Sequence, residues 1–323
     1  MNKLKPLPEE WSGLLNNEQK EAIENINGPL LIIAGAGSGK TRVLTYRYAH
    51  LIKTYGINFE NVLAITFTNK AANEMKDRIS DLLNLELSPK WISTFHSLCV
   101  KMLRIHGHLI GFNNNFTIYD QSDSTKLVRN CMRDSDIDTK QYSPKRIQAH
   151  ISSLKNQRIL PGEAVEFAQS FFDVKVAEIY SSYQKKLMLA NSMDFDDLLI
   201  KAVELLETSD KSLNYWSSKF QYIMIDEYQD TNMVQYRLVE LLASKHKNIC
   251  VVGDSDQSIY AFRGADIRNI EEFESDFKNA KVISLEKNYR SSQKILDIAN
   301  AVISNNPRKK DKKLWTDNDE GLD

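Results

Sequence analysis

A glycine-rich segment between an apolar run and a helical pattern constrains this chain more than any other feature. Residues 34–41 read AGAGSGKT and follow the apolar run LLII at 30–33. A strand, a glycine-rich turn and a helix start in this order form a phosphate-binding loop, because backbone N–H groups and the helix N-terminus converge on phosphate oxygens. In such a loop Lys40 reaches the β- and γ-phosphates, and the Thr41 hydroxyl binds Mg²⁺. We predict nucleotide binding by Gly35, Ala36, Gly37, Ser38, Gly39, Lys40 and Thr41.

Apolar runs alternate with helical patterns on both sides of this loop. This alternation predicts a parallel sheet with crossover helices. Between about 121 and 189 the pattern is helical, with almost no strand-like run. We therefore predict an α/β fold that is interrupted by an all-helical subdomain. Further apolar runs lie at 62–66, 90–94, 221–225, 248–252 and 281–285, and helical stretches at 40–53, 69–83, 95–106 and about 291–304.

Length and composition fit an ordinary globular protein. The 323 residues suggest roughly two domains, and 42 basic against 43 acidic side chains give a net charge of −1. A net charge this close to zero does not indicate a nucleic-acid partner. It does not exclude one, because nucleic-acid binding needs only a local basic face. The start, MNKLKPLPEEW, lacks the apolar stretch of a signal peptide, so we expect a cytoplasmic protein. We expect Cys99, Cys131 and Cys250 to be buried, reduced thiols rather than disulfides or zinc ligands.

Acidic residues follow the apolar run at 222–225. Asp226 and Glu227 come at the carboxyl end of a predicted buried strand, where open α/β sheets bind ligands. Asp226 is suited to hold Mg²⁺, and Glu227 to orient and deprotonate an attacking water. The next run leads into GDSDQ at 253–257, where Gln257 is placed to bond the γ-phosphate or that water. An Asx-rich turn is the alternative interpretation of that segment.

Eight segments in one order make the sequence similar to a known family. They are LNNEQKEAI at 15–23, AGAGSGKT at 34–41, ITFTNKAANEMKDRI at 65–79, STFHSLC at 93–99, DFDDLL at 194–199, IDEYQDTN at 225–232, GDSDQSIYAFRGA at 253–265 and LEKNYRS at 285–291. Together they resemble the UvrD/PcrA/Rep family of superfamily 1 DNA helicases, in which the alanine at position 34 is usual. The resemblance implies a RecA-like motor domain that uses ATP and Mg²⁺ to move 3′→5′ on single-stranded DNA in DNA repair or replication.

The resemblance also implies roles for single residues. Gln19 would read adenine, and Arg42 and Tyr289 would flank that base. Arg290 would place a charge on the γ-phosphate from a second motor domain, which makes Lys40, Glu227, Gln257 and Arg290 the expected catalytic set. The expected DNA contacts are Phe67, Thr94, His96, Tyr260, Phe262 and Arg263.

Physical chemistry supports the aromatic DNA contacts, because aromatic rings stack on bases without sequence preference. Much of the family has Arg-Trp where this chain has Ala261 and Phe262, so we expect a weaker grip on the base there. The alternative for Tyr260 and Phe262 is packing under the sheet, and for His96 a purely structural role.

The helical insertion contains a basic stretch, and an acidic segment follows the insertion. Lys140, Lys145, Arg146, Lys155 and Arg158 lie in a stretch without acids, which fits either phosphate contact or a solvated helix face. The segment DFDD at 194–197 is typical of a helix N-terminus, where capping and the helix dipole favour acids.

The resemblance predicts a division into four segments. Residues 1–110 and 191–283 form motor domain 1A, residues 111–190 form the helical insertion 1B, and residues 284–323 begin a truncated second motor domain, 2A. Since the family builds its sites from both motor domains, we expect this chain to hold half of each site. We expect a monomer that binds single-stranded DNA and its junctions with duplex, binds ATP weakly and does not unwind DNA.

Three other functions compete with a helicase half. A helicase–nuclease subunit of the RecB/AddA type needs a far larger chain. A non-catalytic, ATP-gated DNA-binding module is disfavoured by the intact set Lys40, Glu227, Gln257 and Arg290. A small-molecule P-loop kinase does not explain Gln19 or the aromatic residues of GDSDQSIYAF. Stimulation of ATP hydrolysis by single-stranded DNA separates a helicase from such a kinase.

Overall fold

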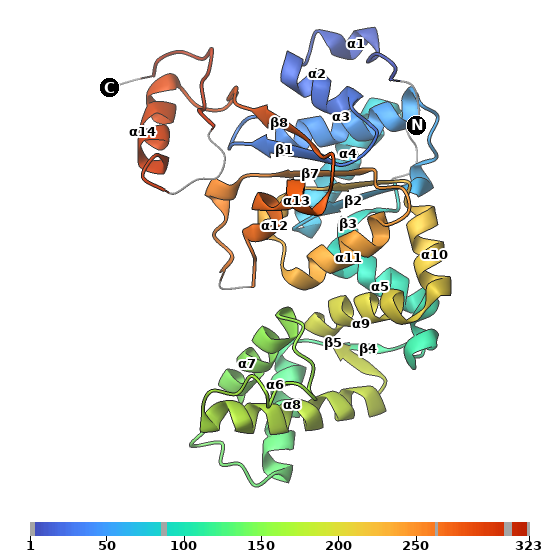
Figure 1. Ribbon diagram of the computed structural model, residues 1–323, viewed down its shortest axis with the longest axis vertical. Helices are drawn as coiled ribbons and strands as arrows, with labels where there is room; N and C mark the ends of the chain where they lie inside the picture. Colours follow the sequence, from blue (N-terminus) through green and yellow to red (C-terminus); the bar gives the residue numbers. More distant parts are fainter. Residues whose placement is uncertain (1–3, 85–88, 262–263, 307–311, 322–323) are drawn as a thin grey trace.

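Six parallel strands form the central sheet of the computed structural model, which describes residues 4–84, 89–261, 264–306 and 312–321 (Figure 1). Their order across the sheet is β3-β2-β6-β7-β1-β8. The strands are β1 (Leu30–Ala34), β2 (Val62–Thr66), β3 (Ile92–Thr94), β6 (Tyr222–Ile225), β7 (Ile249–Gly253) and β8 (Lys281–Leu285). The predicted parallel α/β fold is confirmed, and each predicted run overlaps one of these strands, with ends that agree to within two residues.

Helices cover both faces of this sheet. Since successive side chains of a strand point to opposite faces, Leu30 and Ile32 join one hydrophobic core and Leu31 and Ile33 join the other. Both faces are apolar, as is typical of parallel sheets. One face carries α2 (Asn17–Glu24), α3 (Lys40–Lys53) and α4 (Asn69–Leu83); the other carries α5 (Phe95–His106), α9 (Phe195–Thr208), α10 (Asp210–Lys219) and α11 (Met233–Ala243). Short helices are α1 (Glu9–Ser12), α12 (Arg268–Glu271) and α13 (Phe273–Asp276).

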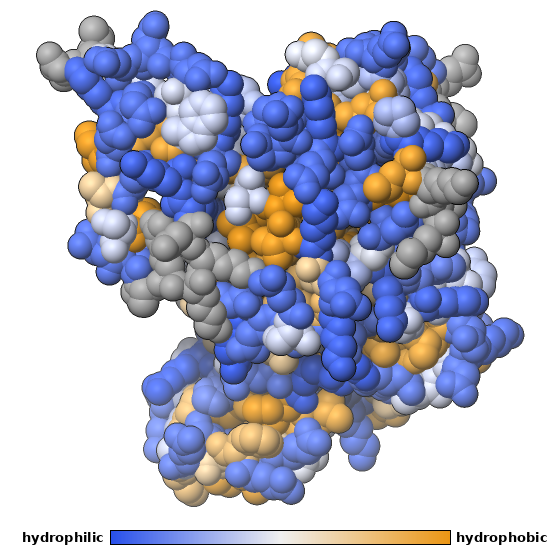
Figure 2. Space-filling view, turned by 45° about the horizontal axis from the view of Figure 1, so that its top comes forward, coloured by the Kyte–Doolittle hydropathy of each residue, from blue (hydrophilic) through white to orange (hydrophobic). Residues whose placement is uncertain are grey.

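The inserted segment forms a separate lobe, at the bottom of Figure 1. Its helices α6 (Gln121–Asp134), α7 (Pro144–Asn156) and α8 (Phe171–Leu189) surround a hydrophobic core of their own. At the base of the lobe, β4 (Thr117–Tyr119) pairs in parallel with β5 (Ser192–Asp194). Between 121 and 189 the described elements are helices, as predicted, and the two-stranded base was not predicted. Apolar side chains also gather on the outer surface of this lobe (Figure 2).

A buried ion-pair cluster joins the insertion to the lobe that contains the six-stranded sheet, which the resemblance predicts to be the motor lobe. The fully buried Lys155 Nζ of α7 lies 2.7 Å from Asp194 Oδ2 and 2.8 Å from Asp197 Oδ1. Asp194 and Asp197 also form the capping box that begins α9, which confirms the predicted helix N-terminus. The Tyr183 hydroxyl donates a hydrogen bond of 2.8 Å to Asp194. The two carboxylates thus share one cation and are both hydrogen-bonded where the two lobes meet.

The predicted basic stretch is not a continuous phosphate-binding face. The prediction of phosphate contact is wrong for Lys155, because its ammonium group is buried in the cluster with Asp194 and Asp197. Arg158 pairs with Glu207 at 2.8 Å, and the Arg146 guanidinium lies over the Phe172 ring at 4.6 Å. Three of the five cations therefore have partners within the protein.

The last strand differs from the predicted division. β8 pairs with β1 along its whole length, from Leu30 opposite Lys281 to Ala34 opposite Leu285. The boundary predicted after residue 283 thus lies inside a strand of the motor sheet. After this strand, α14 (Gln293–Ile303) lies to one side of the sheet (Figure 1). The segment 312–316 then returns, and Trp315 forms a β-bridge with Lys287.

The predicted state of the cysteines can be compared with the fold. The cysteines Cys99, Cys131 and Cys250 are buried and free, as predicted. Within the described ranges, no helix is both long enough and apolar enough to cross a membrane.

Candidate nucleotide and DNA sites

The predicted site residues come together at one edge of the sheet. Because all six strands are parallel, the loops that follow them emerge at the same edge. Residues that are far apart in sequence therefore become neighbours. The segments that follow β1, β2, β6, β7 and β8 carry the phosphate loop, Phe67, the pair Asp226–Glu227, Asp254 and Asn288.

The phosphate loop depends on two glycines in left-handed backbone conformations. The φ angles of Gly37 and Gly39 are 72° and 90°, which other residues rarely adopt. Space is also short, since a Cβ on Gly37 would lie 2.6 Å from Asn288 Nδ2 and one on Gly39 would lie 2.9 Å from Gln19 Nε2. The Ser38 hydroxyl donates a 2.8 Å hydrogen bond to the Gly35 carbonyl. The loop ends at the N-terminus of α3, as predicted for phosphate binding.

Of the three residues expected around adenine, two contact the phosphate loop and the side chain of the third lies elsewhere. Gln19 is buried in the first turn of α2, where it forms a capping box with Asn16, and its Nε2 donates to the Ser38 carbonyl at 3.2 Å. The Tyr289 backbone N–H donates to the Gly37 carbonyl at 2.9 Å, and the Tyr289 side chain is 45% exposed. The Arg42 guanidinium instead lies 5.7 Å from the ring centre of Tyr46. The structure thus brings Gln19 and Tyr289 to the loop.

Lys40 and the acidic pair after β6 are in direct contact. Lys40 Nζ lies 2.8 Å from Glu227 Oε2. Burial, and to a lesser degree the neighbouring Glu227, raises the pKa of Asp226 to about 6, while Lys40 opposes this shift. Glu227 has a φ of 50°, a backbone conformation that costs a residue with a Cβ about 1–3 kcal/mol and is often found at functional sites. A positive group and two carboxylates therefore meet beside the phosphate loop.

A buried glutamine that the sequence reasoning did not select links this acidic pair to the next strand. Gln229 Nε2 donates to Glu227 Oε2 at 2.9 Å, and Gln229 Oε1 accepts the Asp254 N–H at 3.0 Å. Its side chain occupies the space over Gly253, where a Cβ would lie 2.6 Å from Gln229 Oε1. The signal that could have found it is its place within DEYQD, two residues after Glu227.

Gln257 and a lysine from the C-terminal segment both contact Asp254. Gln257 Nε2 donates to Asp254 Oδ2 at 2.6 Å, so this amide lies against the sheet edge. The ammonium group of Lys312 pairs with Asp254 and lies 3.1 Å from Asp256 Oδ2. Burial, with a smaller contribution from Lys40, lowers the pKa of Lys312 to about 8. No local signal in the sequence pointed to Lys312.

Asn288 ties the segment after β8 to the phosphate loop. Its Nδ2 donates to the Ala36 carbonyl at 2.6 Å. Its Oδ1 accepts the N–H groups of Arg290 at 2.8 Å and Ser291 at 2.7 Å. The predicted Arg290 is thus anchored beside the loop by its backbone. Sequence reasoning missed Asn288, although it lies next to the predicted Tyr289.

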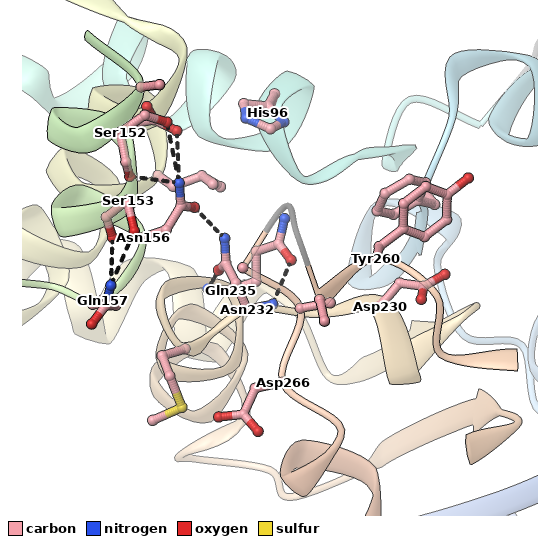
Figure 3. Close-up of a pocket in the computed structure, with 18 of the residues that line it drawn as sticks. His96, Ser152, Ser153, Asn156, Gln157, Asp230, Asn232, Gln235, Tyr260 and Asp266 are labelled. Atoms are coloured by element: carbon pink, nitrogen blue, oxygen red, sulfur yellow. Dashed lines mark hydrogen bonds between the residues drawn. The ribbon is translucent and has the colours of Figure 1, made fainter. Parts of the chain in front are cut away.

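A groove of about 970 Å³ lies between the motor lobe and the insertion (Figure 3). Three predicted DNA contacts line it, namely Phe67, His96 and Tyr260. The Phe67 and Tyr260 rings stack with their centres 5.2 Å apart and their planes at 28°. His96 packs edge-on against Phe195 at 6.0 Å, and burial lowers its pKa.

Thr94, another predicted DNA contact, is not among the described residues that line the groove. Thr94 caps α5, since its hydroxyl accepts the Ser97 N–H at 3.3 Å and donates to Ser97 Oγ at 3.0 Å. Phe262 and Arg263 lie outside the described residues, whereas their neighbour Ala261 lines the groove.

These features define a class of protein. A parallel sheet with a phosphate loop after its first strand and an acidic pair after a central strand is a RecA-like P-loop nucleotide-binding motor domain. A model of the UvrD/REP helicase N-terminal domain matches residues 15–278. The chain therefore belongs to the UvrD/REP helicase family, which confirms the resemblance in the motifs.

Curated relatives agree with the family match. The chain is 50% identical over 308 residues to the ATP-dependent DNA helicase PcrA of Bacillus subtilis, which covers 95% of this chain and 42% of that protein. It is also 50% identical over 307 residues to the PcrA proteins of Staphylococcus aureus (strain Mu50) and Staphylococcus epidermidis, with the same coverage. The chain thus spans less than half the length of these relatives.

Proposed function

We propose that this chain is the amino-terminal half of an ATP-dependent 3′→5′ DNA helicase or translocase that serves DNA repair or replication. The observation that carries the proposal is the Lys40–Glu227 contact of 2.8 Å, at the sheet edge that also bears the stacked pair Phe67 and Tyr260. A phosphate-binding lysine and a water-activating carboxylate then lie beside a groove suited to bases. The family and the names of the PcrA relatives support this combination.

The residues at the sheet edge fit Mg²⁺ and ATP. Lys40 and the backbone of residues 35–39 would bind the phosphates, and Thr41 and Asp226 would hold Mg²⁺. No group of three or more His, Cys, Asp or Glu side chains gathers as a metal site in the described part of the chain. In phosphoryl-transfer sites Mg²⁺ is held by one or two carboxylates together with phosphate oxygens and water. When bound, Mg²⁺ would neutralise part of the negative charge of the phosphates.

In the proposed cycle, Lys40 exchanges partners. In this structure it pairs with Glu227. When the phosphates of ATP contact Lys40 in place of Glu227, the Glu227 carboxylate becomes available to orient and deprotonate a water molecule. We assign Gln257 and Arg290 to the γ-phosphate, and Gln19, Arg42 and Tyr289 to adenine, as the family resemblance implies.

We propose single-stranded DNA, including its junctions with duplex, as the second ligand. Phe67, Tyr260 and His96 would contact it in the groove, and Thr94, Phe262 and Arg263 follow from the family motifs. We expect a monomer, and, because the relatives are bacterial DNA helicases, we place the activity in the cytoplasm.

We keep the four-part division with one change. Motor domain 1A comprises residues 1–110 and 191–285, since β8 belongs to its sheet, and residues 111–190 form insertion 1B. The segment from 286 would begin motor domain 2A. The second half of each site would then come from outside the chain, so we expect weak ATP binding and no unwinding by the chain alone. Processive unwinding by the purified chain would contradict this division.

Nucleotide binding is tested by titrating a fluorescent ATP analogue with Mg²⁺. We expect Lys40→Ala to weaken binding at least about tenfold, because phosphate charge loses its cation. Glu227→Gln is the matched control, since it changes the other half of the same ion pair and should retain binding. Equal affinity of Lys40→Ala and the unaltered chain would overturn the assignment of the nucleotide site.

A further inference from the structure

Lys312 reaches the phosphate-loop edge of the sheet from a segment that is distant in sequence. The segment 312–316 follows α14, and Asn300 of that helix holds it in place. Asn300 Nδ2 donates to the Leu314 carbonyl at 2.9 Å, and Asn300 Oδ1 accepts the Leu314 N–H at 3.2 Å. The Leu314 side chain lies over the start of the loop, where a Cβ on Gly35 would be 2.5 Å from Leu314 Cδ2. Lys312 is therefore carried on a segment that is fixed against the phosphate loop.

Two carboxylates nearly enclose the ammonium group of Lys312. It pairs with Asp254 and lies 3.1 Å from Asp256 Oδ2, and the exposed fractions of the three side chains are 8% for Lys312, 4% for Asp254 and 12% for Asp256. Charges that are so little exposed to water are screened weakly, so they act strongly on their surroundings. Lys312 thus supplies one positive charge against two negative charges at this point of the sheet edge.

Asp254 also holds the side chain of Gln257. Its Oδ2 accepts a hydrogen bond of 2.6 Å from Gln257 Nε2, and its Oδ1 accepts the Asp256 N–H at 3.0 Å. The Gln257 backbone N–H donates to the Asp254 carbonyl at 2.9 Å, so the short turn after β7 is built around this one residue. A contact that fixes the Asp254 carboxylate therefore also fixes the Gln257 amide, which we assign to the γ-phosphate.

One glutamine joins two lysine–carboxylate pairs at this edge. Lys40 pairs with Glu227 at 2.8 Å beside the phosphate loop, and Lys312 pairs with Asp254 directly after β7. The Gln229 amide bridges the two pairs, since it donates to Glu227 Oε2 at 2.9 Å and accepts the Asp254 N–H at 3.0 Å. Burial lowers the pKa of Lys312 and Lys40 adds to this effect, so the two ammonium groups lie within electrostatic range of each other. Each lysine thus offsets acidic charge next to the place proposed for the phosphates.

We propose that Lys312 is a positioning residue of the nucleotide site and sets its preference for ATP over ADP. Lys312 neutralises Asp254, which keeps negative charge away from the γ-phosphate and holds the Gln257 amide in place. Without this cation, the buried carboxylate repels the additional charge of a third phosphate more than it repels a diphosphate. The inference rests on the proposed function, because it concerns the same nucleotide. It adds a residue that lies outside the eight family-like segments of the sequence.

The first test measures the affinity of the intact chain for fluorescent analogues of ATP and of ADP in the presence of Mg²⁺. We expect Lys312→Met to weaken ATP binding about tenfold and ADP binding about threefold or less, because the unpaired carboxylate acts mainly on the γ-phosphate. Lys313→Met is the matched control, since Lys313 is the exposed neighbour of Lys312 in the same segment, and it should change neither affinity. An equal loss for both nucleotides, or no loss for ATP, would overturn the inference.

The second test restores the charge balance of the variant. Lys312→Met combined with Asp254→Asn removes both charges of the pair, and asparagine keeps an oxygen that can accept from Gln257 Nε2. We expect the ATP affinity of this double variant to return to within about threefold of that of the unaltered chain, because a missing pair leaves no buried charge uncompensated. Circular dichroism confirms that both variants fold. A double variant that binds ATP as weakly as Lys312→Met would show that the charge of Asp254 is not the cause, and the inference would be refuted.

The two proposals fail in different ways. If the unaltered chain binds neither analogue, the proposed nucleotide site fails and the inference falls with it. If the chain binds ATP and Lys40→Ala weakens that binding, but Lys312→Met leaves the ratio of the ATP and ADP affinities unchanged, the nucleotide site stands and only the role of Lys312 is refuted.

Discussion

At the scale of single residues, the contact between Gln229 and Gly253 links the acidic pair to the strand that leads to Gln257. A Cβ on Gly253 would lie 2.6 Å from Gln229 Oε1 and 2.7 Å from Ile270 Cδ1. We expect Gly253→Ala to lower the free energy of unfolding by about 1–3 kcal/mol, as overpacking of a tight interior does. Urea denaturation measures this loss. Gly13→Ala is the control, because nothing lies within 4 Å of its Cβ position.

A double-mutant cycle identifies the cause of that loss. If the clash is with the Gln229 side chain, Gly253→Ala should cost at least about 1 kcal/mol less in a Gln229→Ala background. Additive effects of the two substitutions would show that Gln229 does not fill the space over Gly253.

His50 predicts a pH dependence of stability. It is fully buried in α3, its Nδ1 lies 2.9 Å from the Thr54 hydroxyl, and burial, with a contribution from Arg47, lowers its pKa to about 4. Below pH 6.5 the unfolded chain therefore binds a proton that the folded chain excludes, and the free energy of unfolding falls with falling pH. We expect His50 to account for a loss of about 2 kcal/mol between pH 7 and pH 5.

Urea denaturation of the chain and of His50→Gln at both pH values checks this contribution. The variant carries no titrating imidazole, so its stability should fall by about 2 kcal/mol less over the same interval. Equal losses in both proteins would mean that His50 is protonated in the folded state.

Site residues could be predicted from the sequence where they directly follow a strand or begin a helix. Lys40, Asp226 and Glu227 directly follow strands or open a helix, and the structure brings Lys40 and Glu227 together. Gln229, Asn288 and Lys312 were missed, because their contacts depend on which strands become neighbours. Thr94 shows the reverse case, since its hydroxyl caps α5 in this structure.

At the scale of elements, the buried cluster around Lys155 positions the insertion. Lys155→Met would leave Asp194 and Asp197 buried without their cation, so we expect a loss of about 3–5 kcal/mol in the free energy of unfolding. Arg158→Ala removes the nearby, partly exposed pair with Glu207 and should cost about 1 kcal/mol or less. Urea denaturation compares the two variants. A similar small loss in both would refute the anchoring role of Lys155.

Most elements were predictable because each has a strong local pattern. Five of the six strands of the main sheet are buried along their whole length, whereas β8 is partly exposed. The bounds of α3, α4 and α5 agree with the predicted helical stretches. The β4–β5 pair is only three residues per strand, too short for a reliable pattern. The pairing of β8 with β1 was not predictable from local sequence, because these strands lie about 250 residues apart and their contact is set by the whole sheet.

At the scale of the whole molecule, one short segment touches both proposed sites. Glu227 contacts Lys40 at the phosphate loop, and Asn232, five residues later, contacts Asn156 in the groove. Gln229, between them, contacts the strand end that leads to Gln257. A change at the phosphates that moves Glu227 would therefore reach the groove through a few bonded residues. Under the proposed function, this proximity would be the physical basis for coupling ATP hydrolysis to DNA.

The central claim is that this chain carries half of a DNA-stimulated ATPase. The most direct test measures ATP hydrolysis with and without oligo-dT, for this chain and for a form extended to the length of its PcrA relatives, with Glu227→Gln as the inactive control. We predict that oligo-dT stimulates turnover strongly in the extended form and little in the chain alone. Equal turnover in both forms, unaffected by DNA, would show a self-sufficient ATPase and contradict the account.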